Sequence, residues 1–236
     1  MMGYDFGYML WVMLPGMVLS GLASMMVKKT FAKYENVGTA KNMTGAEAAQ
    51  LMLERAGVHD CRIEPVSGRL SDHYDPRVKT LRLSEPVYNA RSISAIGVAC
   101  HEAGHAIQHA TGYKWLQMRS TLVPVTNISS KMSMPVLMVG MLMMSAAPAL
   151  GSWVVIAGII LFSAAVLFSV VTLPVEWDAS ARAKTAMVNA GVVTDQEMQG
   201  AGRVLNAAFL TYLAAAIASI MTLLYYLHRS GLLGRR

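Results

Sequence analysis

Three long stretches of this chain contain no Asp, Glu, Lys or Arg. They run from Phe6 to Val27, from Met132 to Val175 and from Val204 to Leu227, over 22, 44 and 24 residues. A membrane-spanning helix needs about 20 consecutive apolar residues, so the first and third stretches each fit one span and the second fits two. Surface helices of soluble domains keep a polar face, which these stretches lack.

The chain is therefore predicted to be a membrane α-helical protein with about four transmembrane helices. We expect these helices near 7–27, 133–149, 153–173 and 206–227. The two middle helices would form a hairpin over 133–173, with a turn in the segment Ala147-Pro-Ala-Leu-Gly-Ser152.

The charged residues, only 14% of the chain, are concentrated between the apolar stretches. Residues 28–131 carry 14 of the 20 Lys and Arg residues, starting with Lys28, Lys29 and Lys33 directly after the first predicted span. Basic residues that flank a span favour the cytoplasmic side. The chain is therefore predicted to lie in the cell membrane, with its N-terminus outside and with residues 28–131 and 174–205 in the cytoplasm.

The net charge of +6 is explained mainly by this topology. No basic patch with interleaved aromatic residues is present, so nucleic-acid binding is not expected. Cys61 and Cys100 both fall in the predicted cytoplasmic part, where a disulfide is not expected. The sequence leaves the oligomeric state open.

The cytoplasmic part begins with a helix-start signal. Thr44 and Glu47 match a capping box, which predicts a helix through about Arg55 with Gly57 as its C-cap. Alternating segments then predict strands at 61–66 and 78–83, with a loop at 72–77 between them. A second helix is expected from Ser92 or Ser94 through His109. These elements predict a small α+β module within 28–131.

His101 and His105 are four residues apart in this second helix. Residues at this spacing lie on one helix face, so both imidazoles can bind the same zinc ion. Zinc lowers the pKa of a bound water to about 7, and Glu102 is placed to take the proton as a general base. The pattern predicts a zinc hydrolase with Glu102 as its catalytic residue; the alternative is that the two histidines are structural.

A catalytic zinc usually has three protein ligands, and the third is less clear from the sequence. A His six residues after His105 would indicate a metzincin, but Thr111 stands there, and His109 lies on a neighbouring stripe of the helix. The downstream Glu residues are Glu176 and Glu197. Two spans inserted between His105 and Glu176 return both to the same side of the membrane, which favours Glu176; alternatively, Glu176 only marks the end of a span.

The chain resembles the YugP-like neutral zinc metallopeptidases, relatives of the HtpX-like membrane proteases. The resemblance rests on the His101–His105 motif, the hairpin after it and the segment Glu176-Trp-Asp178-Ala, with further matches at Thr44-Gly-Ala-Glu-Ala-Ala, Asp72-His-Tyr-Asp-Pro-Arg and Leu81-Arg-Leu-Ser. It implies a zincin-like module with a gluzincin-type site, in which His101, His105 and Glu176 bind Zn2+ and Glu102 is the base. It further implies a membrane endopeptidase that acts on peptide or protein substrates and opens toward the cytoplasm.

One position departs from the HtpX-like pattern, in which an Asp four residues after the ligand Glu orients a zinc-bound His. Here that position is Ser180, with Asp178 nearby, so the orienting partner stays open; such groups can change metal affinity about 10–100-fold. Tyr74 and Arg182 are candidates for stabilising the oxyanion, with plain surface roles as the alternative.

The predicted strand Lys79–Leu83 lies just upstream of the histidine helix. Metallopeptidases of this general type pair substrate with an edge strand beside the zinc helix, so this strand either binds the substrate backbone or is an ordinary structural strand. The sequence therefore predicts a multi-pass membrane zinc endopeptidase that hydrolyses membrane-associated or misfolded proteins at the cytoplasmic face. The alternatives are a membrane scaffold or chaperone with a structural zinc site, and a zinc hydrolase of non-peptide amides.

Overall fold

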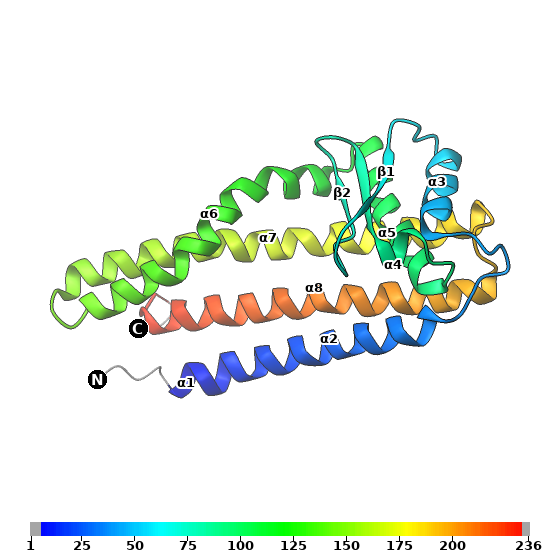
Figure 1. The fold of residues 1–236 in the computed structure, drawn as a ribbon. Coiled ribbons are helices and arrows are strands. Elements are labelled where there is room, and N and C mark those ends of the chain that lie inside the picture. The colour runs from blue at the N-terminus through cyan, green and yellow to red at the C-terminus, as the bar shows by residue number, and fades with distance from the viewer. Residues whose placement is uncertain (1–5, 233–236) are drawn as a thin grey trace. The chain divides into compact units, whose positions relative to one another are not determined.

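The structure, a computed structural model, describes residues 6–232 and is mostly helical (Figure 1). The chain divides into two units. The helical unit contains the described residues up to 22, residues 118–173 and those from 212 on, whereas the α/β unit contains residues 23–117 and 174–211. The boundaries between the units fall inside long helices, which include α2 (Leu14–Glu35), α7 (Pro148–Asn189) and α8 (Asp195–Arg229).

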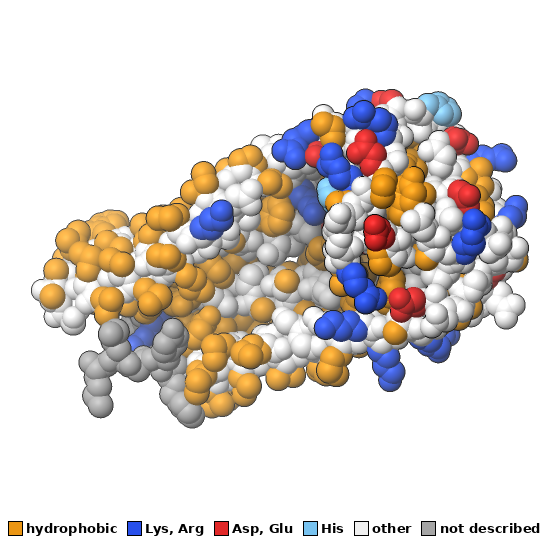
Figure 2. All heavy atoms as spheres, viewed as in Figure 1, with side chains coloured by type: hydrophobic (Ala, Val, Ile, Leu, Met, Phe, Trp, Pro, Cys, Tyr) orange, Lys and Arg blue, Asp and Glu red, His pale blue; other side chains and the backbone are white. Residues whose placement is uncertain are grey.

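The helical unit begins with α1 (Phe6–Tyr8) and a π-helical segment, η1 (Met9–Met13), and also holds most of α6 (Lys114–Met143). On the face shown in Figure 2, hydrophobic side chains cover this unit, whereas charged side chains gather over the α/β unit. Within the described part of the chain, three stretches are long and apolar enough to span a membrane: Met9–Glu35, Pro148–Asn189 and Asp195–Arg229. The predicted span at 133–149 is not among them, and helix α6, which covers most of it, ends at Met143.

The turn between α6 and α7 lies earlier than predicted. Residues 144–147 form the turn, and Pro148, which was expected inside it, is the first residue of α7. Proline suits this position because its missing N–H would have no partner in the first helical turn anyway. The two helices then approach closely at Gly140, where a Cβ would lie 2.7 Å from the Val155 nitrogen.

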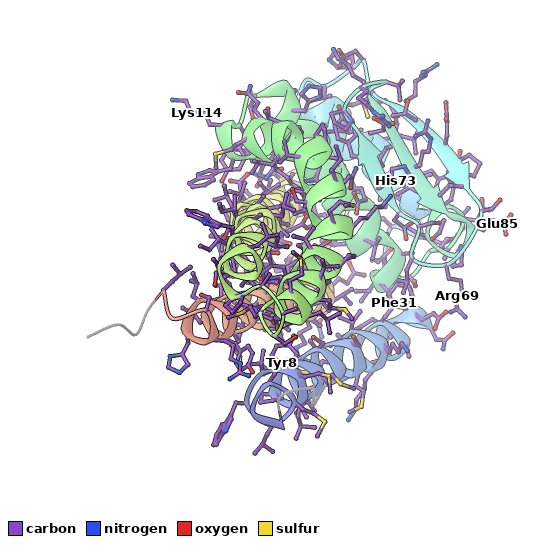
Figure 3. The ribbon with its side chains drawn as sticks, turned by 90° about the vertical axis from the view of Figure 1, so that its left-hand side faces the viewer. Tyr8, Phe31, Arg69, His73, Glu85 and Lys114 are labelled. Carbon is purple, nitrogen blue, oxygen red and sulfur yellow. The ribbon has the colours of Figure 1, made fainter. Side chains whose placement is uncertain are left out.

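Three tyrosines join the first and last helices of the helical unit. The ring of Tyr8, labelled in Figure 3, lies 4.9 Å from that of Tyr225 and 5.7 Å from that of Tyr226. Tyrosine is enriched at membrane–water interfaces. The start of the first apolar stretch and the end of the last one therefore lie at the same end of this unit.

In the α/β unit, the first predicted helix is confirmed as α3 (Gly45–Arg55). The Thr44 side chain accepts from the Glu47 N–H, and the Glu47 side chain accepts from the Thr44 N–H at 2.7 Å, which completes the capping box. Gly57 follows the helix with a φ of 73°, a backbone conformation that glycine adopts without steric cost.

The sheet corrects two predictions. It has the order β1 (Arg62–Val66), β3 (Thr80–Ser84), β2 (His73–Asp75), with β1 parallel and β2 antiparallel to β3. The strand predicted at 78–83 is thus central, not an edge strand, and both of its edges are already paired.

Part of the predicted loop at 72–77 is strand β2. Carboxylates at its two ends hold it against β3: Asp72 accepts from the Ser84 N–H at 2.7 Å and from its hydroxyl at 3.0 Å. Asp75 accepts from the Arg82 guanidinium at 3.4 Å. Sequence alternation does not reveal a strand of three residues whose pairing depends on such side-chain contacts.

The second predicted helix is confirmed as α5 (Ile93–Ala110), which follows the short α4 (Glu85–Tyr88). Helix α5 packs on α3 and the sheet around a core whose largest side chains are fully buried: Met52, Leu53, Leu81, Leu83 and Ile96. Close packing of this kind leaves little freedom for the helix to shift, so the residues on its remaining face are held in place. Cys61 and Cys100 are both free thiols.

Candidate metal centre

Helix α5 carries the two histidines on one face. It begins at its N-cap Ser92, whose hydroxyl accepts from the Ala95 N–H at 3.3 Å, and it ends at Thr111. The imidazole rings of His101 and His105 lie 4.9 Å apart, nearly perpendicular to one another. The four-residue spacing therefore places the rings together as predicted.

The part of α7 that belongs to the α/β unit lies directly against this helix. Gly104 faces the α7 backbone so closely that a Cβ on it would lie 2.5 Å from the Ala179 carbonyl oxygen. Both helices present small buried residues here, since Ala103 and Ala179 are fully buried. This close approach brings Glu176, which precedes Ala179 by one turn, to the two histidines.

His101, His105 and Glu176 form a group that could hold a metal ion, with one ligand atom from each residue within 4.8 Å of the others. One oxygen of Glu176, Oε2, lies 3.1 Å from His101 Nε2 and 3.6 Å from His105 Nε2. Ligand atoms around a tetrahedral zinc with bonds of 2.0–2.1 Å are separated by about 3.3 Å. Two imidazoles and a carboxylate at these distances fit zinc.

Glu176 is only 1% exposed and lies outside the apolar stretch that ends at Val175. Burial by itself raises the pKa of this carboxyl, but the neighbouring imidazoles of His101 and His105 lower it by more, so its pKa lies below the ordinary value. The carboxyl is therefore ionised, which is the form that binds a metal.

The other ring nitrogens of the two histidines contact neutral side chains. His101 Nδ1 lies 3.1 Å from the Ser180 hydroxyl, and His105 Nδ1 lies 3.0 Å from Gln108 Oε1. Asp178, the alternative that the sequence left open, accepts a hydrogen bond from Gln108 Nε2 at 2.8 Å, and the other end of the Gln108 amide faces His105.

The remaining predicted residues lie around this group. Glu102 is half-buried on α5, next to His101. The Tyr74 hydroxyl lies 2.8 Å from His109 Nδ1, and burial raises the pKa of Tyr74, so the hydroxyl keeps its proton. Arg182 donates from Nε to Asp178 at 2.6 Å. An oxyanion role for Tyr74 or Arg182 stays a prediction.

Two residues have roles that sequence reasoning did not assign. Gln108, three residues after His105 on α5, is fully buried against that histidine. Its position in the sequence could have indicated this contact, because residues three positions apart on a helix are neighbours. Glu197, the other downstream Glu, accepts from the Thr194 and Ala40 N–H groups and is a capping residue of α8.

Residues 9–231 match the profile of a family described as "Putative neutral zinc metallopeptidase". The chain is 47% identical over 208 residues to "Putative membrane protease YugP" of Bacillus subtilis (strain 168), which covers 88% of this chain and 90% of that protein. No solved structure gives a significant match. The family match, the relative and a His–His–Glu group that fits zinc agree with one another, and the chain belongs to this family of zinc metallopeptidases.

Proposed function

We propose that this protein is a membrane-embedded zinc endopeptidase of the gluzincin type, with His101, His105 and Glu176 as zinc ligands and Glu102 as general base. The observation that carries the proposal is the convergence of three ligand atoms from two helices within 4.8 Å. Its substrates are peptide bonds of membrane-associated or misfolded proteins at the cytoplasmic face.

The chemistry follows from the residues present. Zinc bound here would polarise the scissile carbonyl and lower the pKa of an attacking water to about 7. Glu102 takes a proton from that water and delivers it to the leaving amine, a role worth about 10²–10⁴-fold in rate. Ser180 and Gln108 hold the two imidazoles in place from behind.

The structural-zinc alternative is less well supported. Structural zinc sites are closed by four protein ligands, whereas catalytic sites keep one position open. In the part of the chain that the structure describes, the group contains three candidate ligands, His101, His105 and Glu176. An open position for substrate or water is therefore part of this proposal.

We also propose four membrane crossings, with α6 as the crossing that is not among the three long apolar stretches of the structure. The contact of Tyr8 with Tyr225 supports this number, because two ends that lie on the same side of a membrane require an even number of crossings. Likewise, α7 can bring Glu176 back to His105 only if the chain crosses once between His105 and α7. Helix α6 spans 30 residues, which is long enough to cross the bilayer.

Substrate pairing is better supported at β2 than at the central strand β3. In the described sheet the two outer strands are β1 and β2. Pro65 interrupts the N–H pattern of β1, whereas β2, on which Figure 3 labels His73, contacts α5. An extended peptide bound to β2 loses main-chain hydrogen bonds when its amides are N-methylated, so such peptides should show a raised KM.

The deciding experiment replaces Glu102 by Gln in the full-length protein. We expect normal zinc content and a kcat lower by about 10²–10⁴-fold on casein and on a membrane-protein substrate. Glu85→Gln, at an exposed position of helix α4, is the matched control and should keep full activity. Retained proteolysis in Glu102→Gln would contradict the mechanism, and turnover of small amides without cleavage of proteins would favour the non-peptide hydrolase.

A further inference from the structure

The amide of Gln108 lies fully buried between the metal centre and an ion pair of α7. We propose that Gln108 is the positioning residue of the zinc site, which fixes the tautomer and ring orientation of His105. The proposal rests on the zinc-peptidase function above and adds a residue that touches neither substrate nor metal.

The orientation of the Gln108 amide follows from its partners. One end lies 2.8 Å from the Val175 carbonyl oxygen and 2.8 Å from Asp178 Oδ2. Both partners only accept hydrogen bonds, so this end must be the NH2 group. The carbonyl oxygen Oε1 is then the atom that faces His105 Nδ1 at 3.0 Å.

This arrangement determines the proton position on His105. An amide oxygen can only accept, so His105 must carry its proton on Nδ1 and present the lone pair of Nε2 to the metal. His101 is not constrained in the same way, because the Ser180 hydroxyl can donate or accept. The structure thus assigns the stricter orienting role to Gln108.

Asp178 and Arg182 brace the amide from the other side. Asp178 accepts from Arg182 Nε at 2.6 Å as well as from Gln108. The Arg182 guanidinium in turn lies 5.5 Å from the centre of the Tyr113 ring. In other metal sites a carboxylate contacts the metal-bound histidine directly. Here the Gln108 amide lies between His105 and the Asp178 carboxylate, which is also paired with Arg182.

The test measures zinc affinity of the solubilised full-length protein by competition with a chromophoric chelator. Gln108→Met keeps the side-chain length but removes the acceptor and both donors. We expect zinc binding about 10–100-fold weaker and an altered visible spectrum after substitution with Co2+. Ser180→Ala should weaken zinc binding less, and Gln50→Met, on the exposed face of α3, should leave it unchanged.

A second variant separates orientation from packing. Gln108→Glu again gives His105 an acceptor, and the protonated oxygen of the new side chain can donate to the Val175 carbonyl or to Asp178, so this variant should bind zinc more tightly than Gln108→Met. Unchanged affinity in Gln108→Met, no recovery in Gln108→Glu, or an equal loss in Ser180→Ala would each overturn the proposal. A wild-type protein without stoichiometric zinc binding would instead contradict the zinc-peptidase function itself.

Discussion

Replacing Gly104 by Ala is expected to weaken zinc binding, because this position sets the distance between α5 and α7. The added Cβ would lie 2.5 Å from the carbonyl oxygen of Ala179, 3.2 Å from its carbonyl carbon and 3.3 Å from its Cα. All three are backbone atoms, so no change of rotamer relieves the contact. The helices must separate by about 0.9 Å before the closest contact becomes an ordinary one.

This separation acts directly on the candidate metal centre. His101 and His105 lie on α5 and Glu176 on α7, whereas metal–ligand distances tolerate changes of only about 0.2 Å. Closing the site around zinc then means compressing an overpacked contact, which costs about 1–3 kcal/mol. When this cost destabilises the zinc-bound protein relative to the zinc-free protein, the zinc affinity drops by about 5–150-fold.

The assay is chelator competition on purified Gly104→Ala, with Gly97→Ala as the matched control. Gly97 lies on the same helix, but a Cβ there would be 3.7 Å from Ala201, an ordinary contact. The control should keep its zinc affinity and gain up to about 1 kcal/mol of helix stability. Wild-type zinc affinity in Gly104→Ala would refute the idea that this contact holds the ligands together.

Three further results are expected. Glu176→Ala should lose zinc, whereas chelator-treated wild type should regain activity when zinc is added; full zinc occupancy in the variant would transfer the ligand role elsewhere. Arg69→Cys, placed in a variant with Cys61→Ser and Cys100→Ala, should react with a membrane-impermeant maleimide only after cells are permeabilised, and labelling of intact cells would reverse the predicted topology. Thr44→Ala should destabilise α3 by about 1 kcal/mol and speed amide exchange there without changing zinc content; unchanged exchange would show that the capping box contributes little.

Local patterns account for the parts of the protein that could be predicted. The charge-free stretches predicted apolar helices because spanning a bilayer is a requirement on consecutive residues. Thr44 and Glu47 predicted the start of α3, since a capping box closes within four residues. The pairing of His101 with His105 follows from the 3.6-residue helical repeat alone.

The predictions that needed correction depend on contacts between distant residues. The position of β3 between β1 and β2 is decided by pairing across the sheet, and a period-two pattern is the same for a central and an edge strand. Likewise, Pro148 is compatible with a turn or with a helix start, and only the packing of α6 against α7 decides between them.

Residues close together in the chain are thus enough to indicate an apolar helical protein with a two-histidine metal motif. The sequence favoured Glu176 as the third ligand but left its role open, and tertiary packing is what brings Glu176 and Gln108 to the histidines. Glu176 is 75 positions from His101, and Gln108 is 70 positions from Asp178. Their approach depends on the small residues Gly104 and Ala179, which let the backbones of α5 and α7 come into contact. The spacing of residues along the chain does not predict such a contact between distant segments.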